Sequence, residues 1–184
     1  MGERPLKLVV SGPVGAGKTT FVRSLSGESM LDTDEAASEE IGKASTTVAL
    51  DFGVCTIDGT PVHLFGTPGQ DRFDFMWEIL CEGALGLILL VSGQHPEQFP
   101  RARKLLEFIT SRIAVPFLIG VTRQDLPRVW EPEEVADYFE LPAQQVHPLV
   151  ATSPASCAAL LAALLELVLR GPETLQEPSD SRFA

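Results

Sequence analysis

The sequence predicts an α/β fold with a mixed, mostly parallel six-stranded sheet and helices on both of its faces. Apolar runs of strand length alternate along the chain with segments of helical spacing, a pattern typical of parallel sheets. Residues 84–91 and 117–121 are almost continuously apolar, as expected of strands that are buried on both faces. Asp58-Gly59 lies between two further apolar runs and indicates a hairpin, so one strand pair should be antiparallel.

The individual elements follow from spacing and from the residues at helix ends. The strand candidates share a run of apolar or β-branched residues and cover 6–10, 48–57, 61–65, 84–91, 117–121 and 146–151. The helix candidates share apolar residues three or four positions apart and cover 20–25, 97–113, 131–139 and 153–170. Residues 27–45 are polar and acidic, which is typical of a functional or mobile loop.

Length and composition indicate one globular domain. A chain of 184 residues, of which 45% are hydrophobic and 21% charged, is long enough to bury one sizeable core. We assign residues 1–172 to this domain. Residues 173–184 follow a helix stop at Gly171-Pro172, and we expect them to form a disordered tail.

The charge balance narrows the class of partner. The chain has 14 Lys and Arg against 25 Asp and Glu, a net charge of −11 that repels nucleic-acid backbones and anionic membranes. No segment has the features of a signal peptide, a membrane span or a lipidation site, and the three cysteines fit neither a disulfide framework nor a zinc site. We therefore expect a cytoplasmic protein with no nucleic-acid partner and no direct membrane anchor.

Residues 12–19 fit the phosphate-binding P-loop pattern G-x-x-x-x-G-K-[ST]. A strand candidate precedes the motif and a helix candidate follows it, whereas an ordinary Gly-rich turn would need neither. The glycines allow the backbone N–H groups to face a phosphate, and the helix N-terminus adds the positive end of its dipole. Lys18 would reach the β- and γ-phosphates and Thr19 would ligate Mg²⁺. The expected nucleotide contacts are Gly15, Ala16, Gly17, Lys18, Thr19 and Thr20.

The order of these elements resembles the Ras-like small GTPases over nearly the whole chain, which implies a Ras-like P-loop NTPase fold and a GTP-binding switch that hydrolyses GTP. Ser45-Thr46-Thr47 looks like switch I, and the resemblance implies that Thr47, with Thr46 as the alternative, contacts Mg²⁺ and the γ-phosphate. Residues 66–73 are similar to the switch II pattern D-T-x-G-Q. There Gly69 would meet the γ-phosphate and Gln70 would orient the attacking water. Arg72 is a candidate internal charge for the transition state.

Two later segments are similar to the base-reading motifs of that family. Thr122-Arg123-Gln124-Asp125 resembles [NT]-K-x-D, in which the Asp125 carboxylate can accept from both the ring N1–H and the exocyclic amine of guanine. Adenine has neither donor in that place. The Arg123 stem could pack on the base. Val150-Ala151-Thr152 stands where the family has S-A-K, so the Ala151 N–H could donate to guanine O6, with Thr152 beside it.

Two departures from the family pattern bear on hydrolysis. Gly66 stands where the family has an acidic residue that holds Mg²⁺ through water, which puts metal binding in doubt. Val14 introduces a branched side chain close to where Gln70 and an inserted arginine must fit. We therefore expect slow intrinsic hydrolysis. A nucleotide-dependent scaffold without useful turnover is the main alternative, and a P-loop kinase or ATPase is the second.

The amino-acid sequences of the switch I and switch II segments look most like those of the prokaryotic small GTPases associated with roadblock-domain proteins. That group is related to the gliding-motility polarity GTPases. This resemblance implies a roadblock/LC7-type partner. The aromatic and aliphatic stretch 73–80 is a candidate docking patch, although its side chains could instead pack beneath a helix.

Overall fold

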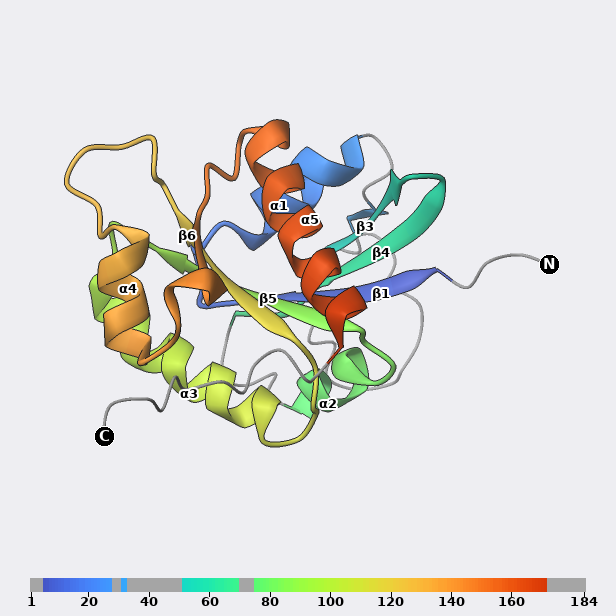
Figure 1. The fold of residues 1–184 in the computed structure, drawn as a ribbon, viewed down its shortest axis with the longest axis horizontal. Coiled ribbons are helices and arrows are strands. Elements are labelled where there is room, and N and C mark those ends of the chain that lie inside the picture. Colours follow the sequence, from blue (N-terminus) through green and yellow to red (C-terminus); the bar gives the residue numbers. More distant parts are fainter. Residues whose placement is uncertain (1–4, 28–30, 33–50, 70–74, 172–184) are drawn as a thin grey trace, which may run out of the picture.

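A seven-stranded sheet forms the middle layer of the protein (Figure 1). The computed structural model describes residues 5–27, 31–32, 51–69 and 75–171. The strand order is β2-β3-β4-β1-β5-β6-β7, with antiparallel pairing of β2 to β3 and β3 to β4 and parallel pairing elsewhere. The strands are β1 (Leu6–Ser11), β2 (Leu31–Asp32), β3 (Asp51–Ile57), β4 (Thr60–Gly66), β5 (Gly86–Ser92), β6 (Phe117–Thr122) and β7 (Val146–Pro148).

Strands form in all six expected ranges, of which residues 48–50 lie outside the described residues, and the mixed, mostly parallel sheet is confirmed. The additional strand, β2, lies at the edge of the sheet within the segment that we expected to be a loop. Two residues are too short for an alternating pattern, so the sequence contains no signal for β2. The hairpin is also confirmed. Asp58 and Gly59 have φ values of 50° and 82°, the positive values at both positions that a type I′ turn requires.

Helices cover both faces of the sheet. They are α1 (Lys18–Ser26), α2 (Phe75–Cys81), α3 (Phe99–Thr110), α4 (Pro132–Phe139) and α5 (Pro154–Arg170), with short 3-10 helices η3 (Pro96–Gln98) and η4 (Ala143–Gln145). Side chains of α1 and α5 share one core with alternate residues of β1 and β5, and side chains of α2, α3 and α4 share the other. The three-layer arrangement explains why the run along β5 is apolar throughout.

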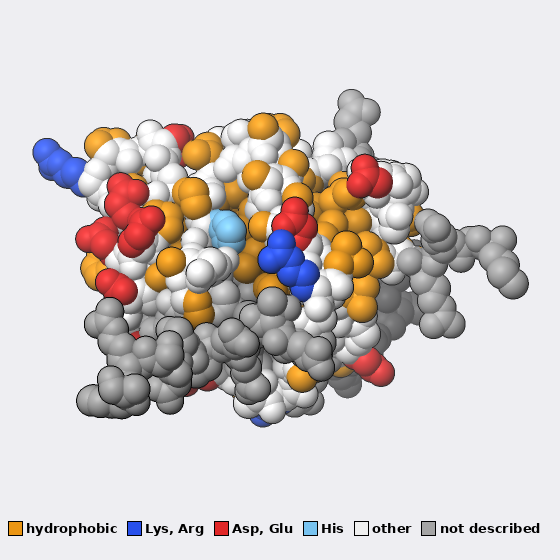
Figure 2. All heavy atoms as spheres, viewed as in Figure 1, with side chains coloured by type: hydrophobic (Ala, Val, Ile, Leu, Met, Phe, Trp, Pro, Cys, Tyr) orange, Lys and Arg blue, Asp and Glu red, His pale blue; other side chains and the backbone are white. Residues whose placement is uncertain are grey.

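The candidate docking patch belongs mainly to the core where it can be described. Trp77 and Leu80 are buried, and the Trp77 ring packs edge-on against Phe108 of α3 with centroids 5.3 Å apart. Ile79 is exposed. The stretch therefore includes only one exposed large apolar side chain among those described. None of the helices in the described ranges has the length and apolar character needed to cross a bilayer. Acidic side chains gather over α4 on the face shown in Figure 2.

Candidate nucleotide site

The phosphate loop joins β1 to α1 and has the backbone conformation that the motif predicts. Gly12, Gly15 and Gly17 have φ values of 148°, 79° and 104°, which residues other than glycine rarely adopt. A Cβ on Gly12 would lie only 2.3 Å from the Leu90 carbonyl oxygen, so this glycine also allows the loop to lie against β5. The loop ends at the N-terminus of α1, where free N–H groups and the helix dipole favour an anion.

Lys18 is buried within the phosphate loop. Its Nζ donates to the carbonyl oxygens of Gly12 and Pro13, at 2.7 and 2.8 Å. Burial lowers the pKa of Lys18 to about 8; the charge of Asp51 acts to raise this pKa, and that of Arg101 lowers it further. The ammonium is therefore mostly protonated at neutral pH and lies where a phosphate group would meet the loop.

Raising the pH through 8 should weaken phosphate binding at this loop. A bound phosphate favours the charged form of Lys18 and raises its pKa, so above pH 8 binding must be accompanied by uptake of a proton. The affinity for a nucleoside diphosphate should then fall by up to about tenfold per pH unit. Titrations between neutral and alkaline pH would measure this slope. Lys18→Ala should bind more weakly and lose this part of the slope, and an unchanged slope in Lys18→Ala would rule out Lys18 as its source.

Asp51 places a carboxylate beside the phosphate loop. Its Oδ2 accepts a 2.6 Å hydrogen bond from the hydroxyl of Thr19, the predicted Mg²⁺ ligand. Asp51 begins β3, and because β3 is antiparallel to β4, this residue lies at the edge where the parallel strands end. Its partner across the strand pair is Gly66, and a Cβ on Gly66 would lie 2.8 Å from the Asp51 Cβ. The acid that is absent from position 66 is thus matched by one on the neighbouring strand.

Hydroxyl and carboxylate oxygens are the donors that Mg²⁺ prefers, and this ion commonly uses one or two carboxylates together with substrate phosphates and water. Thr19 and Asp51 supply such a pair. Within the described ranges no group of three or more His, Cys, Asp or Glu side chains forms an all-protein metal site. The donor set therefore fits a metal that is bound together with phosphates.

The loop that follows β4 is hydrogen-bonded through Thr67 to the end of β1, where the phosphate loop begins. The Thr67 N–H donates to the Val10 carbonyl at 2.8 Å, and its buried hydroxyl lies 2.8 Å from the hydroxyl of Ser11. These bonds continue the pairing of β4 with β1 by one residue past the end of β4. They bring the following residues, Pro68 and Gly69, over the phosphate loop.

Gly69 lies against the phosphate loop itself. A Cβ on this residue would lie 2.8 Å from the Val14 nitrogen and 3.0 Å from Lys18 Nζ. The Gly69 carbonyl accepts a hydrogen bond from the guanidinium of Arg101 on α3. Gly69 therefore lies beside the phosphate loop, and its contact with a γ-phosphate stays a prediction. Thr46, Thr47, Gln70 and Arg72 lie outside the described residues.

The base-reading segments share a cavity with the phosphate loop. Its volume is about 230 Å³, and it opens between the N-terminus of α1 and the loops that follow β6 and β7. Nine residues of its lining are among those predicted from the sequence, and Leu126 is an addition. The lining consists of Gly15, Ala16, Gly17, Thr20, Thr122, Arg123, Asp125, Leu126, Ala151 and Thr152.

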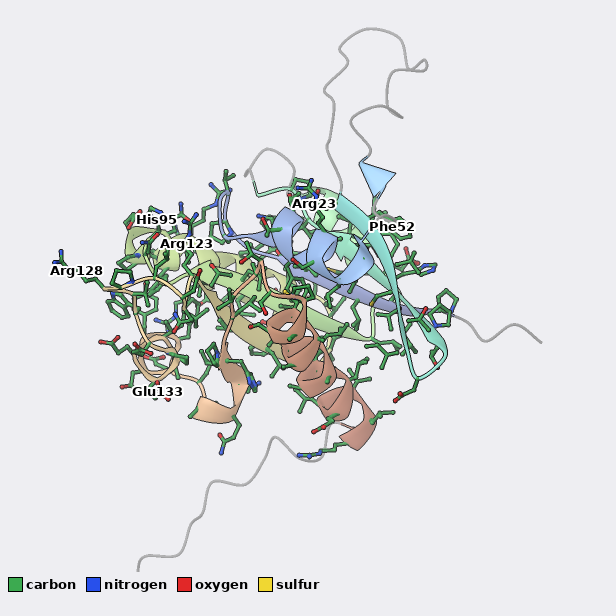
Figure 3. All side chains as sticks on the ribbon, turned by 90° about the horizontal axis from the view of Figure 1, so that it is seen from above. Arg23, Phe52, His95, Arg123, Arg128 and Glu133 are labelled. Carbon is green, nitrogen blue, oxygen red and sulfur yellow. The ribbon has the colours of Figure 1, made fainter. Side chains whose placement is uncertain are left out.

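Hydrogen bonds from three side chains hold the cavity walls in place. Thr122 is buried, and its hydroxyl lies within hydrogen-bonding distance of the Ala16 carbonyl (2.9 Å) and the Val91 carbonyl (3.2 Å), which ties the base-reading loop to the phosphate loop. Ser24 of α1 donates to the Ala151 carbonyl at 2.6 Å. Arg123 has a φ of 67°, and its guanidinium donates to the Gln94 side chain at 3.3 Å, next to His95 (Figure 3). The Arg123 guanidinium is thus bonded to Gln94, and packing of the Arg123 stem on a base stays a prediction.

Sequence reasoning missed two residues of this site. Asp51 stood in a strand pattern, where an acidic residue carries no signal until its cross-strand partner is known. Arg101 lies in α3, 32 residues beyond Gly69, in a segment for which the sequence predicts only a helix. Pairing register and helix position bring both side chains to the phosphate loop.

Comparison with known proteins gives a family for this chain. The family model described as "Conserved hypothetical ATP binding protein" matches residues 28–181, a range that begins after the phosphate loop. The chain is also 30% identical over 129 residues to the uncharacterized protein MJ1339 of Methanocaldococcus jannaschii, a match that covers 68% of this chain and 75% of that protein. Because the family model covers most of the chain, the chain belongs to the family of conserved hypothetical ATP-binding proteins.

Proposed function

We propose that this protein binds a guanine nucleotide in the cavity beside the phosphate loop and acts as a slowly hydrolysing GTP switch. The observation that carries the proposal is that Asp125 lines the same cavity as Gly15, Ala16 and Gly17. A nucleotide whose phosphates lie on the loop would present its base to the loops after β6 and β7. Family membership supports nucleotide binding, and the choice of guanine rests on the chemistry of Asp125.

The carboxylate of Asp125 favours guanine over adenine. Guanine presents two adjacent donors to it, whereas adenine presents an acceptor and a C–H in the equivalent place. Bound adenine would leave the carboxylate without partners in a partly enclosed cavity, which costs more than the loss of two neutral hydrogen bonds. An adenine-nucleotide function is the second candidate, because the description of the family names ATP.

The proposed reaction relies on positioning and on charge. Lys18 and the N–H groups of the phosphate loop would bind the β- and γ-phosphates. Thr19 and Asp51 would hold Mg²⁺, which when bound neutralises charge that develops on the phosphates. Gln70 would orient the attacking water, as the resemblance to Ras-like GTPases implies. Thr47 and a roadblock/LC7-type partner remain proposals on the same ground.

Substituting Gln70 tests whether hydrolysis follows this route. Gln70→Leu keeps a similar volume but cannot orient water, so single-turnover phosphate release from GTP should fall about 100-fold, within the range of general acid–base and positioning effects. Affinity for GDP should stay within about threefold of the parent. Equal rates in the parent and in Gln70→Leu would remove this role. The absence of phosphate release from the parent, with Mg²⁺ in excess and GTP bound, would favour the scaffold alternative.

A further inference from the structure

We propose that Arg101 is a positioning residue that holds Gly69 in the space of a terminal phosphate, so that the site as it stands favours a nucleoside diphosphate over a triphosphate. This inference rests on the proposed nucleotide-binding function and goes beyond it. It assigns Arg101 of α3 to the discrimination between the two states of the nucleotide.

The space between Gly69 and the phosphate loop is too small for a phosphoryl group. An atom placed as Cβ on Gly69 would already lie 3.0 Å from Lys18 Nζ and 2.8 Å from the Val14 nitrogen. The motif directs Lys18 at the β- and γ-phosphates, and the Val14 nitrogen belongs to the loop that surrounds the phosphates. A γ-phosphate has several oxygens, each of which needs about 2.8 Å to a donor nitrogen. A triphosphate therefore requires Gly69 to move away from Lys18, whereas the inner phosphates can use the N–H groups further along the loop.

The contacts around Gly69 indicate which part of the loop would move. Thr67 is held by two hydrogen bonds to β1, through the Val10 carbonyl and the Ser11 hydroxyl. Gly69, two residues later, is tethered through its carbonyl to Arg101. A hydrogen bond from a charged donor is typically stronger than one between neutral groups. Movement of Gly69 is therefore opposed by the bond to Arg101, while the bonds at Thr67 can persist.

The charge of Arg101 is consistent with this position. The guanidinium is near enough to Lys18 to lower the pKa of the ammonium, so both cations lie close to Gly69. The Gly69 carbonyl oxygen is the group that accepts from Arg101 in this arrangement. A terminal phosphate would compete with Gly69 for the same space beside Lys18.

The test compares a diphosphate with a triphosphate on matched variants. Equilibrium titrations of the full-length chain, with Mg²⁺ in excess, would use fluorescent GDP and a fluorescent non-hydrolysable GTP analogue. In Arg101→Ala, the ratio of the triphosphate Kd to the diphosphate Kd should fall about tenfold, the size expected for loss of one charge-assisted hydrogen bond. Arg101→Lys keeps the positive charge but loses the planar donor geometry and should lower the ratio in the same direction.

Arg103→Ala is the matched control. Arg103 lies two residues away on the same helix, but its side chain pairs with Glu107 at 3.7 Å and Glu140 at 2.9 Å. Its substitution should leave the ratio unchanged. Gly69→Ala supplies a second route, because its Cβ would collide with the Val14 backbone in the observed position. This variant should also lower the ratio.

The outcomes separate this inference from the proposed function. A ratio that stays the same in Arg101→Ala overturns the inference, and so does a higher ratio, which would mean that Arg101 itself binds the terminal phosphate. A parent protein that binds neither nucleotide would overturn the proposed function and the inference together. A lowered ratio cannot come from a general loss of stability, because such a loss would weaken the binding of both nucleotides alike.

Discussion

Replacing Asp125 with asparagine is expected to shift the base preference from guanine to xanthine by a factor on the order of a thousand. The carboxylate accepts from two donors on guanine, whereas the asparagine amide offers one acceptor and one donor. Xanthine carries a carbonyl in place of the exocyclic amine of guanine, so it pairs with the amide. The measurement is the Kd of GDP and of XDP for the parent and for Asp125→Asn, at equal Mg²⁺ concentration.

Asp137→Asn provides the control for this substitution. Asp137 is exposed on α4 and does not line the cavity, yet its replacement removes the same charge from a chain with a net charge of −11. The base preference of the control should equal that of the parent. If Asp125→Asn bound GDP as tightly as the parent and gained nothing for XDP, Asp125 would not read the base.

Removing the carboxylate of Asp51 is expected to abolish most of the effect of Mg²⁺ on nucleotide affinity. In Asp51→Gly, the affinity for GTP in the presence of Mg²⁺ should fall about 100-fold, within the range seen when groups around a metal are lost. Without Mg²⁺, the affinity should change little or increase, because a negative charge near the phosphates has been removed. Titrations with and without a chelator would measure both values.

A second substitution can return the acid from the neighbouring strand. The Cβ and carboxylate of Asp51 are the nearest atoms to a Cβ placed on Gly66, so Asp51→Gly clears the space that a side chain at position 66 needs. The double variant Asp51→Gly with Gly66→Asp should recover a substantial part of the Mg²⁺ effect. Asp58→Gly, in the distant β3–β4 turn, is a control for the loss of charge. A full Mg²⁺ effect in Asp51→Gly would contradict the role of Asp51.

The fold was predictable because its signals are local. The apolar runs fixed the expected strands, and Asp58-Gly59 identified the hairpin through a turn that two adjacent residues determine. Helix ends were equally local: Ser153 caps α5 by accepting from the Ser156 N–H at 3.2 Å. The two-residue strand β2 was not predicted, because its pairing depends on β3, which begins 19 residues after β2 ends.

The site was predictable where a motif contains both the residue and its context. The phosphate loop and Asp125 were assigned from spacing, and the cavity contains both. Asp51 and Arg101 could not be found in this way, because their roles depend on contacts with Thr19 and Gly69 across 32 residues in each case. The doubt about metal binding that Gly66 raised has the same origin. The motif shows that an acidic residue is absent from position 66, and only the strand register shows that Asp51 lies opposite it.

The most direct test of the account is a competition between GTP and ATP for the parent protein. Fluorescent GDP would be bound to the full-length chain with Mg²⁺ in excess and displaced by each unlabelled nucleotide. We expect GTP to displace it at a concentration above that of the bound GDP, in keeping with the preference for a diphosphate. ATP should require at least a 1,000-fold higher concentration than GTP, because adenine leaves Asp125 unpaired. Displacement by ATP at the same concentration as GTP would contradict the guanine assignment and would favour the adenine function that the family description names.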